Sequence, residues 1–325
     1  MTGDARLRAS RRLDLGLALR AEGDLPAAID AFTAAIDEDD TWAEAHFVLA
    51  ETLRKAGRTD DAARTFQRYL SLDPEDRMGA TAELAHLGAA PVPDRLPAAY
   101  VATLFDQEAR RYDSDMLGPL GYRGPDIILN ALTGLIARIP GDGLILDAGC
   151  GTGLIGRAVR VLGRAMDGID ISEAMLVEAA RTGLYRALRR VDLAAEDWAP
   201  AGTQYDVIVA GDVFNYMGDL APILGRAVQA LKPGGLLVFT VEAGDGPGFA
   251  MGPARRFLHD ALQLRAWAQG ALFETLALES AVLRQEARLP VASWVMTLAL
   301  PKAPSEASPP LQGRRTVPRD GQGSA

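Results

Sequence analysis

The sequence predicts an α/β fold in which a mostly parallel sheet follows an all-α domain of helical repeats. Two observations lead to this prediction. Residues 144–156 pass from an apolar segment through a glycine-rich loop into a helical segment, which is typical of a buried parallel strand that ends at a ligand site. Residues 9–76 repeat several residue types at a fixed spacing, which is typical of stacked helix pairs.

The spacing of the repeat is 34 residues. Gly23 recurs as Gly57, and Phe32 recurs as Phe66, each 34 positions later in the chain. This is the period of the tetratricopeptide repeat, in which each unit is a helix pair. The sequence therefore predicts an all-α domain at residues 9–87. Its expected units are two repeats and one capping helix, at residues 9–42, 43–76 and 77–87.

A change in composition marks the boundary between the two predicted domains. Residues 88–97 are rich in proline, so we expect a linker there. The second domain is expected at residues 98–302, with helices over residues 98–138 before the first strand. Pro, Ser, Gly and Gln dominate residues 303–325, which predicts a disordered tail.

Apolar segments separated by turn residues predict the remaining elements of the second domain. The first strand, at residues 144–146, is followed by strands that alternate with helical segments, as in a parallel sheet. Further strands are expected at 166–170, 205–210 and 236–241, and residues 190–193 are expected to hold the third strand and the turn after it. A helix at 255–269 and a final hairpin pair at 276–283 and 291–300 are expected to follow.

The loop after the first strand carries the clearest functional signal. Gly149, Gly151 and Gly153 let the backbone turn sharply and approach a ligand, and the following helix presents free N–H groups to it. Residues 151–156 match the dinucleotide pattern G-x-G-x-x-G, and Asp170 lies 19 positions after its first glycine. An NAD(P)-dependent oxidoreductase is therefore one interpretation of the chain.

The carboxylate of Asp147, at the start of the loop, favours a different ligand. It would repel a pyrophosphate, whereas it suits a ligand that carries an ammonium and a sulfonium group and no phosphate. Asp147-x-Gly149-x-Gly151-x-Gly153 resembles the first motif of class I S-adenosylmethionine-dependent methyltransferases. The resemblance implies a Rossmann-like sheet, mostly parallel with an antiparallel C-terminal hairpin strand, and S-adenosyl-L-methionine as the cofactor.

Segments on both sides of the loop sharpen this resemblance. Together with the repeats they resemble bacterial methyltransferases that contain tetratricopeptide repeats, over most of residues 9–302. The resemblance implies an in-line displacement at the sulfonium carbon, for which the enzyme mainly positions the nucleophile opposite sulfur. The segments include Leu104-Phe105-Asp106, Tyr112-Asp113, Gly121-Tyr122-Arg123 and Arg256-Phe257-Leu258-His259.

The same resemblance implies which residues contact the cofactor. Asp170 would accept hydrogen bonds from both ribose hydroxyls, and Asp192 would lie near the exocyclic amine of adenine. Tyr112 and Tyr122 would close over the methionyl end, and no metal ligands are expected. The full expected set is Asp147, Gly149, Cys150, Gly151, Gly153, Asp170, Ile171, Met175, Asp192, Leu193, Tyr112 and Tyr122.

Two residues are candidates for a base that removes a proton from the methyl acceptor. His259 lies in the helix expected after the fifth strand, and Asp212 lies in the loop after the fourth strand. Their structural alternatives are a packed histidine and a helix cap. The loop at 211–216 lacks the Asn/Asp-Pro-Pro-Tyr pattern that holds an amide or exocyclic amine, which disfavours adenine or glutamine methylation. Arg284 and Glu286 are expected to form an exposed ion pair on the hairpin, and the alternative is that they line the substrate side of the site.

The composition narrows the range of partners. The chain has 325 residues, a net charge of −9 and no basic stripe, which disfavours nucleic-acid binding. It contains no apolar run long enough for a membrane span. A single cysteine, Cys150, is compatible with a reducing cytoplasm. We expect an unidentified small-molecule or protein acceptor, with the repeats as a docking or dimerisation surface. A repeat adaptor whose methyltransferase fold binds cofactor without catalysis is the alternative to an enzyme.

Overall fold

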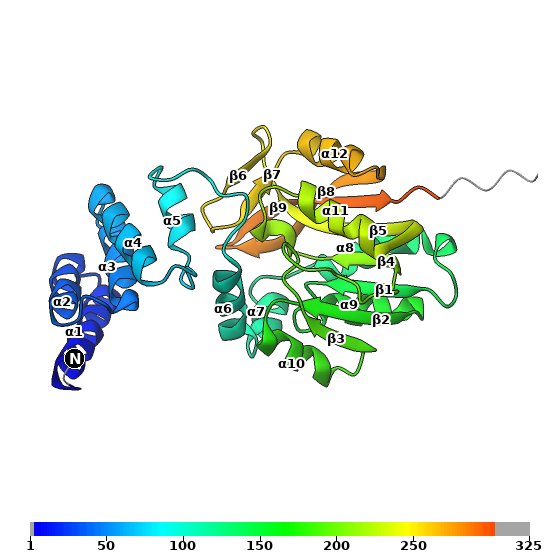
Figure 1. Ribbon diagram of the computed structural model, residues 1–325. Helices are drawn as coiled ribbons and strands as arrows, with labels where there is room; N and C mark the ends of the chain where they lie inside the picture. Colours follow the sequence, from blue (N-terminus) through cyan, green and yellow to red (C-terminus); the bar gives the residue numbers. More distant parts are fainter. Residues whose placement is uncertain (1–2, 303–325) are drawn as a thin grey trace, which may run out of the picture.

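The computed structural model describes residues 3–302, in which a stack of helices precedes a nine-stranded, mostly parallel sheet (Figure 1). The predicted fold class is confirmed, including the antiparallel hairpin at the end of the sheet. The tail predicted at 303–325 lies outside the described residues. None of the helices within residues 3–302 is long and apolar enough to cross a membrane.

The helical stack has the internal period that the sequence predicts. Phe32 and Phe66 are fully buried at equivalent positions, and Gly23 and Gly57 adopt positive φ angles of 88° and 75° in the turns between helices. Asp24 caps the second helix by accepting a hydrogen bond from the backbone N–H of Ala27 at 3.1 Å. The helices are α1 (Gly3–Glu22), α2 (Leu25–Glu38), α3 (Ala43–Lys55), α4 (Thr59–Leu72) and α5 (Ala80–His86).

The sheet contains the strands in the order β3-β2-β1-β4-β5, all parallel, with β7 and β6 beyond the end of β5. Most of β5 pairs with β9, which runs antiparallel and pairs in turn with β8. The strands are β1 (Leu144–Ala148), β2 (Ala165–Asp170), β3 (Ala187–Arg190), β4 (Tyr205–Ala210), β5 (Leu231–Ala243), β6 (Phe249–Met251), β7 (Phe257–His259), β8 (Glu274–Glu286) and β9 (Leu289–Ala299).

Helices cover both faces of the sheet, and β4 is buried over its whole length. The helices of this part are α6 (Ala98–Glu108), α7 (Tyr112–Leu117), α8 (Gly124–Thr133), α9 (Leu154–Val159), α10 (Glu173–Arg181), α11 (Ala221–Ala230) and α12 (Ala261–Gly270). Three short 3-10 turns complete the chain: η1 (Ile136–Arg138), η2 (Arg160–Leu162) and η3 (Phe214–Tyr216).

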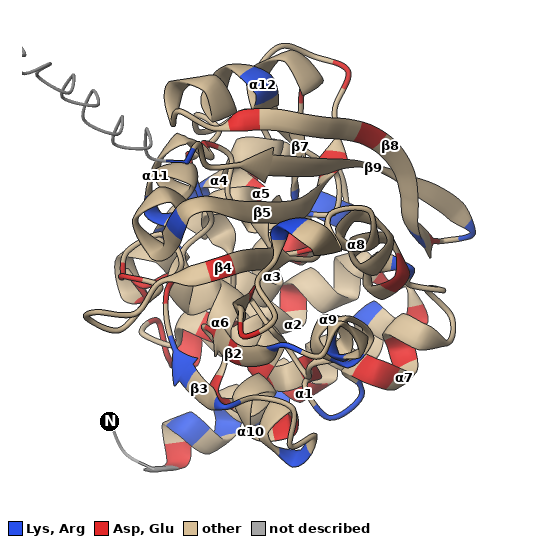
Figure 2. Cartoon of the chain, turned by 90° about the vertical axis from the view of Figure 1, so that its right-hand side faces the viewer, with Lys and Arg blue, Asp and Glu red and all other residues tan. Residues whose placement is uncertain are grey.

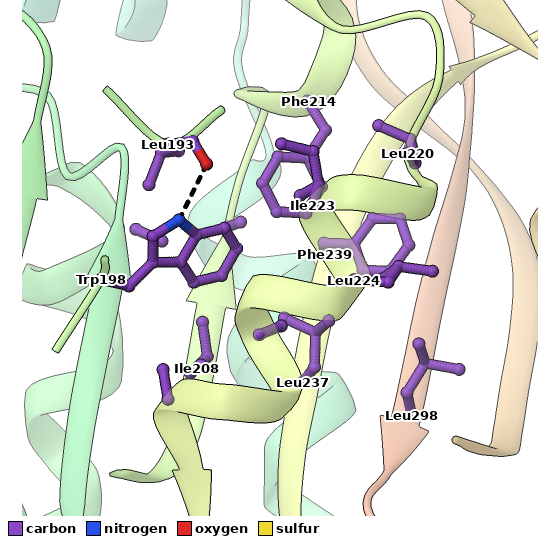
Figure 3. Packing of buried hydrophobic residues seen from close by; sticks show 14 of the residues in the cluster. Leu193, Trp198, Ile208, Phe214, Leu220, Ile223, Leu224, Leu237, Phe239 and Leu298 are labelled. Carbon is purple, nitrogen blue, oxygen red and sulfur yellow. Dashed lines mark hydrogen bonds between the residues drawn. The ribbon is translucent and has the colours of Figure 1, made fainter. Parts of the chain in front are cut away.

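Trp198 belongs to the largest hydrophobic cluster of the described residues (Figure 3). Its indole packs beside Phe214, and its Nε1 donates a hydrogen bond to the carbonyl of Leu193 at 2.9 Å. Because Leu193 and Phe214 belong to loops at the carboxyl end of the sheet, this single buried side chain fixes two loops that a ligand in that position would contact.

The segment 190–193, expected to hold the third strand and the turn after it, contains the end of β3 at Arg190 and the loop from Val191 to Leu193. One predicted element is wrong in position. The helix expected at 255–269 begins only at Ala261, because Asp260 caps it by accepting from the N–H of Gln263 at 3.0 Å. Residues 257–259 instead form β7, which pairs with two strands that no local pattern in this segment reveals. One is β6, which is separated from β7 by a loop, and the other is β5, which lies further back in the chain.

The helical stack contacts the sheet domain through α5 and not only through the chain connection. Ala82 of α5 packs in one cluster with Leu96, Tyr100 and Phe257. Arg255, at the turn before β7, forms ion pairs with Glu83 at 3.3 Å and with Glu51 at 3.7 Å. Figure 1 shows α5 between the other repeat helices and the sheet domain.

Charged residues of both signs are interspersed over the elements that face the viewer in Figure 2. On this side of the molecule, Lys and Arg are therefore not gathered into one basic surface.

A pair of glycine substitutions tests the packing of the repeats. A Cβ atom at Gly16 would lie 2.4 Å from the ring of Phe32, whereas a Cβ at Gly225 of α11 would meet nothing within 4 Å. We expect Gly16→Ala to lower the free energy of unfolding by about 1–3 kcal/mol through overpacking. Gly225→Ala, the matched control, should raise it by roughly 0.5–1 kcal/mol through helix propensity.

Thermal unfolding followed by circular dichroism measures both variants. An increase in stability for Gly16→Ala equal to that of the control would show that the Phe32 ring moves aside and does not fix the contact between α1 and α2.

Candidate functional site

The loop between β1 and α9 is shaped by three glycines in the left-handed region. Gly149, Gly151 and Gly153 have φ angles of 71°, 52° and 93°, which side chains rarely adopt. A Cβ at Gly149 would lie 2.3 Å from Val213, while the open face of Gly151 has only the ring of Tyr112 at 4.0 Å. The backbone at Gly151 is therefore available for close approach by a ligand.

A cavity that is open to solvent at its mouth lies above this loop at the carboxyl ends of β1, β2 and β4. Eight of the twelve residues expected at the cofactor line it, which brings together loops from four different parts of the chain. These eight are Tyr112, Gly149, Gly151, Asp170, Ile171, Met175, Asp192 and Leu193.

Asp170, at the end of β2, is the buried carboxylate of this cavity. Its Oδ2 accepts the N–H of Gly151 at 2.8 Å, and its Oδ1 accepts the N–H of Ser172 at 2.9 Å. Burial raises the pKa of Asp170 to about 6, while these backbone hydrogen bonds act in the opposite direction. Each carboxylate oxygen retains a lone pair, so the group can still accept from two ligand hydroxyls.

Asp192, in the loop after β3, lines another side of the same cavity. Its Oδ1 accepts the N–H of Ala194 at 2.9 Å, and its Oδ2 accepts from the Arg95 guanidinium at 3.2 Å. The sequence predicted Asp192 as a cofactor residue but did not predict Arg95, because residues 88–97 were interpreted only as a linker.

Aromatic rings from α6 and the loop after β4 form a further wall. The Phe105 ring lies 6.2 Å from that of Tyr112 and 5.4 Å from that of Tyr216, both in edge-to-face geometry. Phe105, Tyr112 and Tyr216 all line the cavity.

Two carboxylates connect helices α6 and α7 to the loops that follow β2 and β1. Asp106 of α6 accepts from the Ser172 hydroxyl at 2.5 Å, and Asp113 of α7 accepts from Thr152 and, at 2.7 Å, from Arg157. Sequence reasoning assigned Asp106 and Asp113 no role. The signal that could have found them is their place in the two motifs Leu104-Phe105-Asp106 and Tyr112-Asp113, which precede the loop.

Asp147 does not line the cavity, so its expected contact with a ligand ammonium stays a prediction that this geometry does not support. It is fully buried behind the loop, where its Oδ2 accepts from the Tyr185 hydroxyl at 2.7 Å. Burial raises the pKa of Asp147 to about 7. The side chain points behind the strand end because side chains alternate along β1, and Asp147 belongs to the strand rather than to the loop.

Three other expected cofactor residues are also absent from the cavity lining. Cys150 packs beneath the loop against Leu176 and Ala179, and burial raises the pKa of its thiol. A Cβ at Gly153 would face Tyr185, and the Tyr122 ring lies against Gly124. These residues shape the loop and its support, and their expected contacts with a ligand stay predictions.

His259 does not line the cavity, so its expected role as catalytic base stays a prediction that this geometry does not support. It ends β7 and is fully buried, and its Nε2 donates to the carbonyls of Met217 at 2.9 Å and Gly218 at 3.2 Å. Burial lowers the pKa of His259 to about 4, so the ring is neutral near pH 7. Its role is to hold the loop after β4 against β7.

Asp212 does line the cavity, from the loop after β4. Its φ angle is 62°, and its carboxylate contacts the Asn215 amide and, at 2.5 Å, the Arg284 guanidinium. Burial raises the pKa of Asp212, and the positive charge of Arg284 partly offsets that shift. The expected helix-capping alternative is not observed, because its carboxylate bonds to side chains.

Arg284 is the centre of a buried ionic cluster, which corrects the exposed hairpin pair expected for Arg284 and Glu286. Its side chain is 3% exposed and contacts Asp212, Glu242 and, at 2.9 Å, Glu286. Arg256 contacts Glu242 at 2.5 Å and also Glu286. Within residues 3–302 no group of three or more His, Cys, Asp or Glu side chains is arranged to hold a metal ion.

Comparisons with known families agree with this geometry. The family described as methyltransferase domain matches residues 146–237, and the family described as tetratricopeptide repeat matches residues 13–77. The first range runs from β1 into β5 and contains most of the cavity. The second contains the two repeats.

Curated relatives match the same region. Methyltransferase-like protein 27 of Homo sapiens is 34% identical over 140 residues, which cover 42% of this chain and 56% of that protein. The ubiquinone biosynthesis O-methyltransferase of Thiobacillus denitrificans is 34% identical over 100 residues, which cover 30% of this chain and 43% of that protein. The chain thus spans about half the length of these relatives.

Solved structures share the fold. The (4+2)-cyclase SpnF has a TM-score of 0.50 at 21% identity, covering 62% of this chain and 96% of that one. The 1,6-didemethyltoxoflavin-N1-methyltransferase of Burkholderia thailandensis has a TM-score of 0.50 at 17% identity, covering 66% and 94%. Together with the sheet order and the glycine loop, these matches show that residues 146–237 are similar to the methyltransferase-domain family, in a fold shared with S-adenosylmethionine-dependent methyltransferases of class I, and that a segment similar to tetratricopeptide repeats precedes them.

Proposed function

We propose that this chain binds S-adenosylmethionine in the cavity above Gly151 and transfers its methyl group to an acceptor hydroxyl. The observation that carries the proposal is that Asp170 and Asp192 line one cavity with the open face of Gly151. This arrangement fits an adenosine, since Asp170 can accept from two ribose hydroxyls and Asp192 from an amine.

The cofactor supplies an activated methyl group on a sulfonium, and the protein residues supply position and proton transfer. Met175 and Ile171 provide apolar contact beside the nucleotide part of the cavity, and Tyr112 borders the end nearest Gly151 and Asp212. Holding the acceptor in line with the reacting carbon would supply most of the rate enhancement.

Asp212 is the residue that we propose as the base for the acceptor proton. It is buried, it lines the cavity next to Tyr216, and burial raises its pKa towards the range useful for proton transfer. Two findings support a hydroxyl acceptor: several curated relatives are named O-methyltransferases, and the loop at 211–216 lacks the pattern that holds an amide.

For the domains, we propose that residues 98–302 form the catalytic unit and that the repeats at 9–87 dock a protein partner or a second copy of the chain. The repeat family match at 13–77 supports a role in protein contact. The acceptor itself is proposed only as a small molecule or protein that carries a hydroxyl.

The pH dependence of cofactor binding tests the role of Asp170. Its carboxylate must be ionised to accept from ribose hydroxyls, and its pKa is about 6 before a ligand binds. Affinity for S-adenosylhomocysteine should therefore be retained above pH 7 and be lost as the pH falls through 6. At pH 5 the affinity should be about tenfold lower, because roughly a tenth of the protein is then ionised.

Isothermal titration calorimetry at pH 5 and 7.5 measures this effect. Asp170→Ala should weaken binding about tenfold to a hundredfold, by loss of charge-assisted hydrogen bonds worth roughly 1.5–3 kcal/mol. Asp170→Asn should bind weakly with no pH dependence of this origin, and Asp197→Asn, an exposed control, should match the unmodified protein. Binding of NADH with no binding of S-adenosylhomocysteine would overturn the proposed cofactor.

The choice between Asp212 and His259 is tested by labelled S-adenosylmethionine and an extract of the organism that carries the gene. If Asp212 removes the proton, Asp212→Asn should lower the rate of label transfer by about 10²–10⁴-fold. His259→Ala should lower thermal stability, because it removes a buried ring and its hydrogen bonds, yet leave the rate per folded molecule within about twofold.

Calorimetry with S-adenosylhomocysteine controls for loss of cofactor binding in both variants. If Asp212→Asn transfers label at the rate of the unmodified protein, no base is needed and positioning alone carries the reaction.

A further inference from the structure

The segment that joins the repeats to the sheet domain is built into the cofactor cavity. The carbonyl of Asp94 accepts the N–H groups of Gly218 at 2.7 Å and Asp219 at 3.0 Å, and the N–H of Leu96 donates to the carbonyl of Tyr216 at 3.0 Å. Residues 94–97 therefore run antiparallel to the loop after β4, with a bridge between Arg95 and Met217.

Arg95 and Leu96, the two central residues of this segment, contact different parts of the molecule. Leu96 is buried and packs with Ala82 of α5 and with Phe257, so it contacts both the repeats and β7. Arg95 and Leu96 both line the cavity. The Arg95 guanidinium reaches Asp192 at 3.2 Å, and the two residues are 97 positions apart in sequence. The ion pair thus joins the segment to the loop after β3.

We propose that Arg95 is a positioning residue for recognition of the adenine, and that it acts through Asp192. This inference rests on the proposed function, in which Asp192 accepts from the exocyclic amine. Asp192 Oδ1 is already bonded to the N–H of Ala194, and Arg95 bonds to Oδ2. These two contacts together fix the rotation of the carboxylate and leave one lone pair on Oδ2 for an amine donor.

Removal of the Arg95 side chain should weaken recognition of the adenine amine and leave the other ligand contacts in place. The Asp192 carboxylate would rotate more freely, so its contact with an amine would weaken, while contacts to the ribose and to the amino-acid part of the ligand would remain. The pair is partly exposed, with side-chain exposures of 46% and 19%, so the effect is small. We expect an affinity loss for S-adenosylhomocysteine of about twofold to fivefold.

The experiment compares two ligands on the full-length protein by isothermal titration calorimetry. S-adenosylhomocysteine carries the amine, and S-inosylhomocysteine carries a carbonyl oxygen at the same position. The unmodified protein should prefer the amine. Arg95→Ala should weaken binding of S-adenosylhomocysteine and leave S-inosylhomocysteine within about twofold, so the preference shrinks. Arg226→Ala, which removes an ion pair to Asp197 remote from the cavity, should change neither affinity.

A second pair of variants shows whether Arg95 acts through Asp192. In an Asp192→Ala background, Arg95→Ala should cause no further loss of affinity, since the partner through which it acts is already gone. Arg95→Lys, which keeps the charge, should restore part of the preference for the amine.

Three results would count against the proposal. Equal weakening of both ligands by Arg95→Ala would assign Arg95 a general structural role in the segment, and no weakening of either would remove it from the site. An undiminished loss in the Asp192→Ala background would show that it does not act through Asp192. Failure of the unmodified protein to bind S-adenosylhomocysteine would instead overturn the proposed function itself.

Discussion

The carboxylate of Asp170 is the interaction on which the cofactor cavity depends. It accepts N–H groups from the loop after β1 and from the start of α10, so a single buried group holds two βα loops at a fixed separation. The parallel order β3-β2-β1-β4-β5 brings those loops together at one edge of the sheet. Burial raises the pKa of Asp170, and the hydrogen bonds from the two backbone N–H groups partly offset that rise.

The acceptor side of the cavity is organised by a different kind of interaction. Arg284 and Arg256 are shared among three carboxylates, those of Asp212, Glu242 and Glu286, which come from a loop and from two strands. Burying charges is unfavourable unless each has a partner, so the cluster is stable only as a unit. It places one carboxylate, that of Asp212, at the cavity surface and holds the others behind it.

The repeats and the catalytic part are connected through this same region. Arg255, two residues before β7, pairs with Glu51 and Glu83 of the repeats, and the neighbouring Arg256 belongs to the buried ionic cluster. The buried ring of His259 at the end of β7 supports the loop that carries Asp212. Packed and charged contacts therefore run from the repeats to the loops that line the cavity.

The sequence by itself determined the fold class, the 34-residue period and most of the expected residues that line the cavity, because each depends on local signals. Positive φ at Gly149 and Gly151 favours glycine, and Asp170 follows directly after an apolar strand segment in the sequence. Only the tertiary structure decided the direction of Asp147, the burial of Arg284 and His259, and the place of Arg95. Each of these depends on partners far away in the chain, such as Tyr185, Glu242, Met217 and Asp192, and no local pattern encodes which distant residue a side chain will meet.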